Sequence, residues 1–488
     1  MNLSALPDRR AAEAPDSPCV ADDGAALTNA QFHERVLRAA AALHRREIEA
    51  GDVVAVMLPN TVDLVVALFA AWRLGAAVTP LNPSLSDDEA RYQIADAGAK
   101  VVIANAGRDI GCATVLGTAD LVVEPARDNL TPVHGDEALA LLIYTSGTTG
   151  RPKGVMLDHA NLNAMCGMVI AQFDLTAVDH SLLILPLFHV NGIVVSTLSP
   201  LAVGGQTTIA GRFDPATFFE RVERTNATYF SAVPTIYTML AHLPVDQNRD
   251  TSSLRFAVCG AAPANVELLD KFESRYGVPV VEGYGLSEGT CASAVNPLHG
   301  KRKPGTVGLP LPGQQIRIAD ADGYPVPAGE TGEVLIWGPN VMRGYLNRPE
   351  ETAVTVIDGW LHTGDIGRLD EDGYLVLVDR VKDMIIRGGE NIYPKEIEAV
   401  AYRLPEIAEA AVVARDSAVY GQEPVMFVAA TSGCQVDVAR VRTHLEAALA
   451  KYKRPVEITV LDELPKNPVG KIDKPALRRR AAMAMPSV

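Results

Sequence analysis

The apolar residues in the N-terminal part of the chain alternate between the period of a strand and the period of a helix. Residues 52–60 read as a strand that ends in a turn, and residues 62–76 carry a helical apolar face that ends at a glycine. Similar alternation continues through residues 101–106 and 182–188. Because strands that alternate with helices form sheets covered by helices, this pattern predicts an α/β fold with a large N-terminal domain.

Two later segments depart from this alternation. Residues 313–339 are β-rich, with Asp-Gly and Ala-Gly turns typical of hairpins, and they predict a barrel-like or sheet segment appended to the α/β subdomains. Beyond residue 380 the pattern becomes that of a small α+β unit. Its predicted elements are helices at 394–403 and 436–450 and strands at 408–414, 425–431 and 457–460.

We place the domain boundary near Asp379–Lys382. This choice gives an N-terminal domain of residues 1–379 and a C-terminal domain of residues 380–488. The boundary falls in a short polar joint, DRVKD, between two predicted strands. From periodicity alone this joint is either a hinge or an ordinary turn.

The charge balance and the cysteines exclude several classes of protein. A net charge of −15 over 488 residues argues against a general binder of nucleic acid or of anionic membranes. Six cysteines are scattered without CxxC spacing, which is typical of reduced thiols in a cytoplasmic protein and gives no metal or redox signature. The N-terminus shows no apolar core of a secretory signal.

Residues 182–205 carry no formal charge and are long enough to be considered as a membrane helix. Pro186, His189, Gly192 and Pro200 interrupt the stretch, and no basic flank orients it. We therefore expect a buried strand, a turn and a helix here, and no transmembrane segment.

The stretch YTSGTTGRPKG (144–154) follows an apolar run, residues 139–143, that reads as a buried strand. Glycines let backbone N–H groups turn toward an anion, and serine and threonine hydroxyls add donors, so a phosphate is the natural guest. From Gly147 the chain reads GTTGRPKG, which lacks the Walker pattern and disfavours a P-loop NTPase. The alternative is a flexible surface loop.

Two further stretches carry residue types that suit phosphate chemistry. In EGYGLSEGT (282–290), the Ser287 hydroxyl and the Glu288 carboxylate suit a phosphate oxygen and a Mg²⁺ ion, although Ser-Glu after a glycine also begins many helices. In LPKNPVGKI (464–472), Lys471 follows a Pro/Gly turn. Lys471 is either a solvated lysine or one that a mobile loop delivers to a phosphoryl group.

A third stretch, WLHTGDIG (360–367), suits a sugar. Asp365 follows a Thr-Gly turn, and Arg380 lies fifteen residues further on. Such a pair can hydrogen-bond the vicinal hydroxyls of a ribose. The alternative is that Asp365 is a turn or cap residue.

Taken in order, these stretches resemble the core motifs of the acyl-adenylate-forming superfamily, which includes acyl-CoA synthetases, aryl-CoA ligases, luciferases and nonribosomal peptide adenylation domains. CGAAPA (259–264) and DRVKDMIIRGGENIYP (379–394) belong to the same series. The resemblance covers residues ~25–475 and is closest to the acyl-CoA synthetases. It implies that ATP and a carboxylic acid form an acyl-adenylate with release of pyrophosphate, that the acyl group then moves to coenzyme A, and that Mg²⁺ assists.

The resemblance also implies roles for individual residues. The β- and γ-phosphates of ATP would be held by Thr145, Ser146, Gly147, Thr148, Thr149 and Lys153. Adenine would lie against Gly260, Ala261 and Ala262 with Tyr284 stacked on the base, and the ribose would bind Asp365 and Arg380. Ser287, where the family usually has threonine, would contact the α-phosphate, Glu288 would hold Mg²⁺, and Lys471 would bridge the carboxylate and the α-phosphate.

In this family the C-terminal domain changes position between the two half-reactions. Lys382 occupies the hinge position. In the thioester step the loop of Arg387, Gly388 and Gly389 would replace Lys471 at the site and help to form a tunnel for pantetheine. The resemblance thus predicts two active sites that are assembled alternately.

The acid pocket would be lined by Val190, Asn191, Val233, Gly283, Gly285 and Leu286, with His189 either gating it or packed in the core. Amino-acid-activating relatives carry an aspartate in this wall, and residues 186–192 have no acidic residue, so an α-amino acid is disfavoured. Malonate-type ligases carry an arginine where this chain has Gly283, which would leave a distal carboxylate unpaired. These features favour an aliphatic or aryl acid, and an oxalate- or malonate-type acid is the alternative.

Three classes remain open at this stage. The first is an acyl- or aryl-CoA ligase, which we favour. The second is a stand-alone adenylating enzyme that loads a separate carrier protein. The third is a luciferase-like or inactive relative, which the retention of Lys471, Glu288 and the loop hydroxyls disfavours. The sequence predicts no oligomeric state.

Overall fold

The computed structural model describes residues 2–483 with internal gaps. The gaps are residues 106–109, 112–113, 128–129, 134, 146–150, 245–249, 262–263, 265, 381–382, 389, 418, 432 and 467–470. The chain forms two compact units. The N-terminal unit comprises residues 1–317, 335–362 and 373–375, and the C-terminal unit comprises residues 318–334, 363–372 and 376–488.

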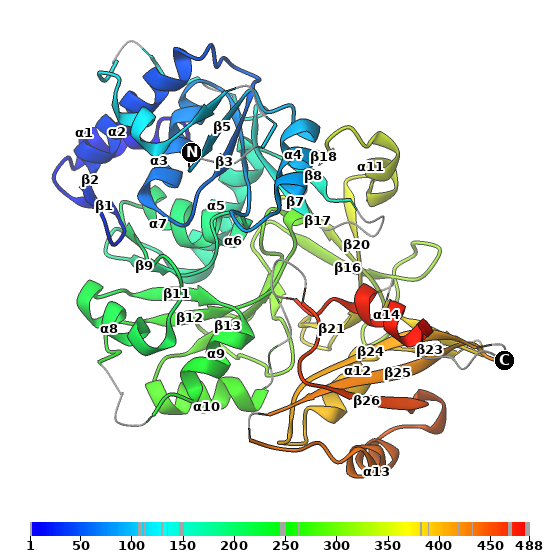
Figure 1. The fold of residues 1–488 in the computed structure, drawn as a ribbon. Helices are drawn as coiled ribbons and strands as arrows, with labels where there is room; N and C mark the ends of the chain where they lie inside the picture. Colours follow the sequence, from blue (N-terminus) through cyan, green and yellow to red (C-terminus); the bar gives the residue numbers. More distant parts are fainter. Residues whose placement is uncertain are drawn as a thin grey trace. The chain divides into compact units, whose positions relative to one another are not determined.

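The N-terminal unit contains two large sheets with helices packed on them (Figure 1). The first sheet has the order β15-β14-β13-β12-β11-β9-β10-β1-β2. Its strands are β1 (Pro18–Ala21), β2 (Ala26–Thr28), β9 (His180–Leu183), β10 (Gln206–Ile209), β11 (Tyr229–Ala232), β12 (Phe256–Cys259), β13 (Val280–Tyr284), β14 (Ala294–Val295) and β15 (Leu309–Pro310).

The second sheet has the order β18-β8-β7-β4-β3-β5-β6. Its strands are β3 (Val53–Met57), β4 (Ala77–Pro80), β5 (Val101–Ala104), β6 (Val115–Leu116), β7 (Leu139–Thr145), β8 (Lys153–Asp158) and β18 (Gly344–Tyr345). The helices of this unit are α1 (Leu6–Glu13), α2 (Asn29–His44), α3 (Val62–Arg73), α4 (Asp87–Asp96), α5 (His159–Phe173), α6 (Val190–Ile193), α7 (Ser199–Ala202), α8 (Pro215–Thr225), α9 (Pro234–Ala241), α10 (Val266–Tyr276) and α11 (Pro349–Thr355).

Local sequence explains where these elements begin and end. All of α3 except Asp63 is buried, which agrees with its apolar composition, and Gly75 follows it with φ +76°. Helix α4 begins at a capping box in which Ser86 and Glu89 each bond the backbone N–H of the other. These elements and β7 confirm the strand–helix pattern predicted from the sequence.

The charge-free stretch 182–205 is a strand, a turn and short helical segments: β9, α6, a π-helical turn (Val194–Leu198) and α7. The expectation of a buried strand, turn and helix is confirmed. Among the residues that the structure describes, no helix combines the length and the apolar character needed to span a bilayer.

A third sheet is formed by the β-rich segment, in the order β16-β17-β20-β19, with β21 paired to β20. Its strands are β16 (Gln315–Ala319), β17 (Gly332–Trp337), β19 (Val356–Ile357), β20 (Trp360–Leu369) and β21 (Leu375–Arg380). Strands β16, β17, β20 and β21 each run from one compact unit into the other.

The rest of the C-terminal unit is an α+β structure around one sheet, of order β23-β22-β25-β24, with β26 paired to β25. Its elements are β22 (Ile385–Arg387), β23 (Glu390–Ile392), α12 (Pro394–Ala401), β24 (Ile407–Ser417), β25 (Gly421–Ala430), α13 (Val438–Ala448), β26 (Glu457–Leu461) and α14 (Lys474–Met483). The five elements predicted from the sequence beyond residue 390 are confirmed, and β22 agrees with the strand expected after the DRVKD joint, whereas β23 and α14 were not predicted.

Alternation along β24 explains why this sheet is covered on both faces. Ala410 and Val412 point into one core, shared with α12 and α13, whereas Ala411 and Val413 point into another, which includes Leu477 of α14. Figure 1 shows α12 and α13 on one side of the sheet and α14 on the other. The predicted α/β fold with a small α+β C-terminal part is confirmed.

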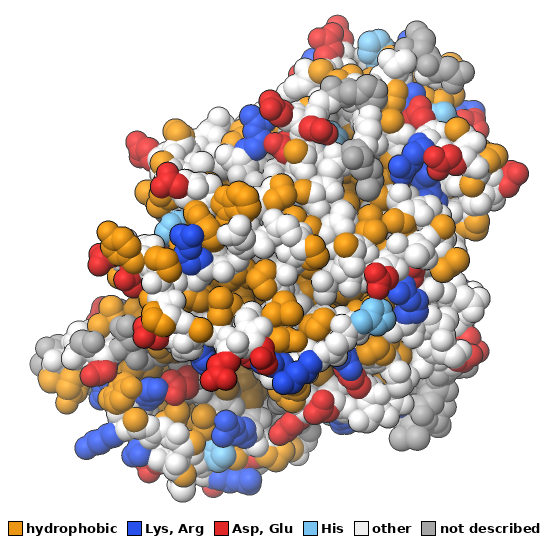
Figure 2. Space-filling view, turned by 180° about the vertical axis from the view of Figure 1, so that it is seen from behind, with side chains coloured by type: hydrophobic (Ala, Val, Ile, Leu, Met, Phe, Trp, Pro, Cys, Tyr) orange, Lys and Arg blue, Asp and Glu red, His pale blue; other side chains and the backbone are white. Residues whose placement is uncertain are grey.

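Acidic and basic side chains are mixed on the molecular surface. Figure 2 shows them interspersed with apolar side chains over one face. On that face the charges of either sign are spread out, in keeping with the net acidic composition.

Candidate functional site

Four parallel neighbours in the first sheet end at the same edge. Strand β11 pairs with β9 and with β12, and β12 pairs with β13, all in parallel. The register places Ala232 beside Cys259 and Cys259 beside Glu282. Val233 follows β11, Gly260 follows β12, and Gly283 lies near the end of β13, so the three meet at one edge. Open α/β sheets bind ligands at such an edge.

The turn after β13 is fixed by a close approach of two backbones. A Cβ atom at Gly285 would lie 1.8 Å from the carbonyl oxygen of Cys291, so only glycine fits. Tyr284 is largely buried, and Leu286 precedes a short 3₁₀ helix (Ser287–Gly289). The sequence left open whether Ser287 and Glu288 begin a helix, and they do.

The predicted acid pocket begins after β9. His189 precedes helix α6, is partly exposed, and lies 4.7 Å from the ring of Phe188, centroid to centroid. His189 is therefore not a fully buried core histidine. In the next residues, Val190 is buried, and Oδ1 of Asn191 is buried without a hydrogen-bond partner among the described residues.

The loop that carries His189 is held from both sides. The side chain of Asn60 donates to the carbonyl of Leu185 and accepts from the N–H of Leu187, both at 2.9 Å. A Cβ atom at Gly192 would lie 2.7 Å from the carbonyl oxygen of Pro186, so the turn closes tightly. These contacts fix the wall of the predicted pocket.

The glycine-rich stretch joins β7 to β8. Thr145 and Lys153 face each other at the last position of the antiparallel pair. The predicted phosphate ligands Ser146, Gly147, Thr148 and Thr149, like Ala262 of the predicted adenine site, lie outside the described residues.

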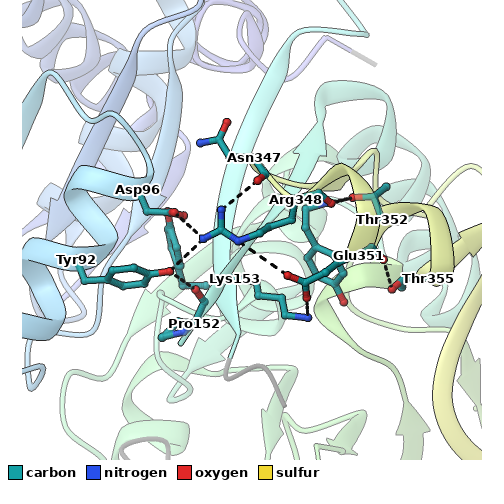
Figure 3. Close-up of polar contacts among 11 residues, drawn as sticks. Tyr92, Asp96, Pro152, Lys153, Asn347, Arg348, Glu351, Thr352 and Thr355 are labelled. Atoms are coloured by element: carbon teal, nitrogen blue, oxygen red, sulfur yellow. Dashed lines mark hydrogen bonds and ion pairs between the residues drawn. The ribbon is translucent and has the colours of Figure 1, made fainter. Parts of the chain in front are cut away.

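Lys153 lies between a carboxylate and an aromatic ring. Its ammonium group forms an ion pair with Glu351 of α11 (Figure 3). The same group lies 4.9 Å from the ring centroid of Tyr345. The Tyr345 hydroxyl donates to Oε1 of Glu288 at 2.9 Å. Lys153 and Glu288, which the sequence assigned to phosphate and Mg²⁺, thus touch the same tyrosine.

A second group of contacts ties together both ends of the glycine-rich loop (Figure 3). Asp96 accepts from the hydroxyl of Tyr144 at 2.9 Å and pairs with Arg348 at 3.1 Å. Tyr92 donates to the carbonyl of Pro152 at 3.0 Å. Burial, reinforced by Asp96, raises the pKa of Tyr144, so its hydroxyl stays protonated and acts as a donor.

The chemistry of Glu288 fits a Mg²⁺ ion. Tyr345 occupies one carboxylate oxygen, and no described residue bonds the other. No group of three or more His, Cys, Asp or Glu that could hold a metal occurs in the described part of the chain. Mg²⁺ does not need such a group, because it prefers one or two carboxylates together with substrate phosphates and water.

Gly260 and Ala261 follow β12 at the same edge. The N–H of Gly260 donates to the carbonyl of Ala232 at 3.2 Å. Ala261 adopts a left-handed conformation with φ +67°, which is uncommon for a residue with a side chain and concentrates at functional sites.

In the C-terminal unit, Asp365 and Arg380 are brought together. Oδ1 of Asp365 lies 2.7 Å from Nε of Arg380, and Asp365 is buried within β20. The backbone turns at Gly364, where φ is +66°. Asp365 thus lies within a strand, next to this turn, and is paired with Arg380, so it does not cap a helix.

The other predicted residues of this unit lie in two turns. Gly388 connects β22 to β23 with φ +60°, and Lys471 is exposed beside Ile472, which bridges to Lys466. Lys382 and Gly389 lie outside the described residues.

Comparison with known proteins gives the class. Residues 7–346 match the family model of the AMP-binding enzymes, and residues 396–471 match that of the AMP-binding enzyme C-terminal domain. The chain belongs to this family, and the predicted superfamily is confirmed.

The chain matches CoA ligases over nearly the whole length of both proteins. The chain is 38% identical to a feruloyl-CoA synthase of Amycolatopsis sp (98% of this chain, 99% of the relative) and 36% identical to an oxalate–CoA ligase of Arabidopsis thaliana (97% of each). A solved structure of O-succinylbenzoate coenzyme A synthetase from Bacillus subtilis, with ATP and magnesium ion, matches with a TM-score of 0.89 at 30% identity over 98% of each chain. The chain is an AMP-forming acyl-CoA synthetase, and the enzyme class predicted from the sequence is confirmed.

Sequence reasoning missed Tyr345, Glu351, Arg348 and Asp96. The signal that could have drawn attention to three of them is the charged segment YLNRPEET (345–352), which begins α11. Nothing in the spacing of that segment shows that it packs against Lys153.

Proposed function

We propose that this enzyme joins an aryl or aliphatic monocarboxylic acid to coenzyme A through an acyl-adenylate, with Mg²⁺ bound at Glu288. The observation that carries the proposal is the contact of Lys153 and Glu288 with the same tyrosine. A lysine suited to the terminal phosphates and a carboxylate suited to the metal therefore lie on either side of one side chain, which supports a bound triphosphate with its Mg²⁺. The ATP and magnesium ion in the Bacillus subtilis structure and the CoA ligase relatives support ATP, Mg²⁺ and coenzyme A as ligands here.

In the first half-reaction, a carboxylate oxygen of the acid attacks the α-phosphorus, the bond to the β-phosphate oxygen breaks, and pyrophosphate leaves. Lys153 neutralises charge on this leaving group, and Ser287 donates to an α-phosphate oxygen. Lys471 bridges the two anions that must approach each other. Mg²⁺, when bound, supplies further neutralisation of the phosphates.

In the second half-reaction, the sulfur of coenzyme A attacks the acyl carbon, AMP leaves, and the thiol proton passes to solvent or base. We propose that the C-terminal domain, residues 380–488, turns about Lys382 between the two steps and brings the Arg387–Gly389 loop in place of Lys471. Asp365 and Arg380 hold the ribose. Gly260, Ala261, Ala262 and Tyr284 hold the adenine, in keeping with the position of Gly260 and Tyr284 at the sheet edge.

The acid pocket is proposed to lie at the same edge, lined by Val190, Asn191, Val233, Gly283 and Leu286, with His189 at its mouth. Gly283 offers no counter-ion for a second carboxylate, and the feruloyl-CoA synthase relative supports an aryl acid. The unsatisfied Oδ1 of Asn191 favours an acid that carries a hydrogen-bond donor, such as a hydroxyl group.

A second candidate is a small dicarboxylic acid, which the oxalate–CoA ligase relative favours. A carrier-protein thiol in place of coenzyme A is a further alternative for the acceptor. The five described cysteines are free thiols, which supports the reducing environment of the cytoplasm as the proposed compartment.

The test is pyrophosphate release, measured over hydroxylated and plain aryl acids, short and long aliphatic acids, and oxalate, each with and without coenzyme A. We expect the highest kcat/KM for an aryl or aliphatic monocarboxylic acid, together with an acyl-CoA product. Preference for oxalate would establish the second candidate. Pyrophosphate release without an acyl-CoA product for any acid would point to a carrier protein.

A further inference from the structure

Tyr345 is held rigidly between two functional groups that come from different elements. It belongs to strand β18, where it lies opposite Val155 of the antiparallel strand β8. Because side chains alternate along a strand, Lys153 lies on the same face as Val155 and diagonally across from Tyr345. This register brings the lysine ammonium to 4.9 Å from the tyrosine ring centroid.

The other end of the same ring reaches Glu288. The backbone of Glu288 is bound to the segment that leads into β18, since the N–H of Met342 donates to the Glu288 carbonyl at 2.8 Å. The Tyr345 hydroxyl then donates to Oε1 of the Glu288 side chain at 2.9 Å. Both the main chain and the side chain of Glu288 are therefore fixed by one short stretch of chain.

Tyr345 itself has little freedom. Its ring is 9% exposed, and its N–H donates to Oγ1 of Thr352 at 2.9 Å. An ionised carboxylate oxygen can only accept, so the Tyr345 hydroxyl donates to Glu288 in a fixed direction.

We propose that Tyr345 is a positioning residue that sets Lys153 and Glu288 relative to each other, so that the cation for pyrophosphate and the carboxylate for Mg²⁺ share one rigid support. This inference rests on the proposed function, because it takes the roles of Lys153 and Glu288 from there. The two contacts use different parts of the side chain. The ring face attracts the ammonium, and the hydroxyl orients the carboxylate.

The two contacts can be separated by two substitutions. Tyr345→Phe keeps the ring face and removes only the hydroxyl, whereas Tyr345→Leu removes both. Tyr276→Phe is the matched control: Tyr276 is 8% exposed, and its hydroxyl donates at 2.8 Å to the carbonyl of Leu240. It loses a comparable hydrogen bond that touches neither Lys153 nor Glu288.

The measurement is calorimetric binding of α,β-methylene-ATP to the full chain, first without Mg²⁺ and then across a Mg²⁺ series. For Tyr345→Phe we expect a rise of about 10-fold in the Mg²⁺ concentration that produces half of the Mg²⁺-dependent change in affinity for the analogue. Loss of a partner that orients a metal ligand costs about 10- to 100-fold in metal affinity. The metal-free Kd should change less than 2-fold. For Tyr345→Leu we expect the Mg²⁺ shift and, in addition, a metal-free Kd weakened about 3- to 30-fold.

Lys153→Ala and Glu288→Gln are measured alongside. The proposal would be overturned if Tyr345→Phe and Tyr276→Phe shifted the Mg²⁺ dependence equally. It would also be overturned if Tyr345→Phe responded to Mg²⁺ like the wild type while Glu288→Gln showed an altered response. If Lys153→Ala and Glu288→Gln both bind the analogue like the wild type, the proposed function of these residues fails, and the role of Tyr345 fails with it. The two failures are thereby distinguished.

Discussion

At the scale of single residues, the most informative contact is the ion pair between Lys153 and Glu351. Lys153 is 14% exposed and Glu351 is 33% exposed at their side chains, so the pair is only partly shielded from water. An anion that binds Lys153 has to share or displace this carboxylate. If Lys153 binds pyrophosphate as proposed, Glu351 competes with that anion for the lysine.

Glu351→Gln is expected to lower the Kd for pyrophosphate. A half-exposed ion pair contributes about 0–1 kcal/mol, so the change should be up to about 5-fold, and it should shrink as salt is added. Calorimetric titration with pyrophosphate at two ionic strengths measures it. The neighbouring exposed residue serves as the control, since Glu350→Gln should leave the Kd unchanged. A weaker affinity in Glu351→Gln would show that the carboxylate assists the phosphate instead of competing with it.

The sequence allowed the residues with recognisable motifs to be named, but not their partners. Asp365 and Arg380 are fifteen residues apart and do meet, at 2.7 Å. The contacts of Glu351, Asp96 and Tyr345 could not be predicted, because contacts between distant segments leave no periodic signal in a single sequence. Their neighbours are set by which strands pair, above all β18 with β8.

At the scale of elements, strand β13 and the turn that follows it determine the shape of the site. Glu282 lies in β13 and accepts from the N–H of Ala264, and burial raises the pKa of its carboxyl to about 7. The turn at Gly285 is closed by the backbone of Cys291.

Glu282 makes the stability of the fold depend on pH. Its pKa is raised in the folded chain above the ordinary value of 4.5, so the folded state binds more protons between about pH 4.5 and 7. The stability contributed by the protonated carboxyl is fully present below pH 4.5 and is lost as the pH rises through 7. Compared with the wild type, Glu282→Gln should be equally stable at pH 4 and up to about 3 kcal/mol more stable at pH 8. Denaturant unfolding at both pH values checks this. The prediction is contradicted if the difference in stability between Glu282→Gln and the wild type is the same at pH 4 and at pH 8.

Two substitutions of glycine by alanine should change the free energy of unfolding in opposite directions. In Gly285→Ala the new Cβ meets a carbonyl oxygen at 1.8 Å, so the turn must shift, and we expect a loss of about 3 kcal/mol in unfolding free energy. In Gly167→Ala, within α5, the new Cβ has nothing within 4 Å, and the helix should gain about 0.5–1 kcal/mol. Urea unfolding compares them. A stable Gly285→Ala protein would show that this turn is not closely packed.

Most elements could be predicted from their period, but some could not. Strand β23 has three residues, too few to show alternation. Helix α14 buries only Leu477 and Ala481, so its sequence reads as a basic tail. Both contribute to the C-terminal unit through contacts that only the folded sheet creates.

At the scale of the whole molecule, the predicted residues are divided between two compact units. Lys153, Tyr284, Ser287 and Glu288 belong to the N-terminal unit, whereas Asp365, Arg380 and Lys471 belong to the C-terminal unit. The predicted boundary at residue 380 remains a prediction, as does the hinge at Lys382. The proposed exchange of Lys471 between the half-reactions is compatible with its place in a different unit from Lys153 and Glu288.

The most direct test of this account is the separation of the two half-reactions in Lys471→Ala. Adenylation is measured as acid-dependent exchange of pyrophosphate into ATP, and thioester formation as acyl-CoA produced from a supplied acyl-adenylate. Removing the bridging cation should lower adenylation by about 10²- to 10³-fold, the scale of one stabilising electrostatic group. Thioester formation should remain within about 3-fold of the wild type. Equal loss of both activities would contradict the account.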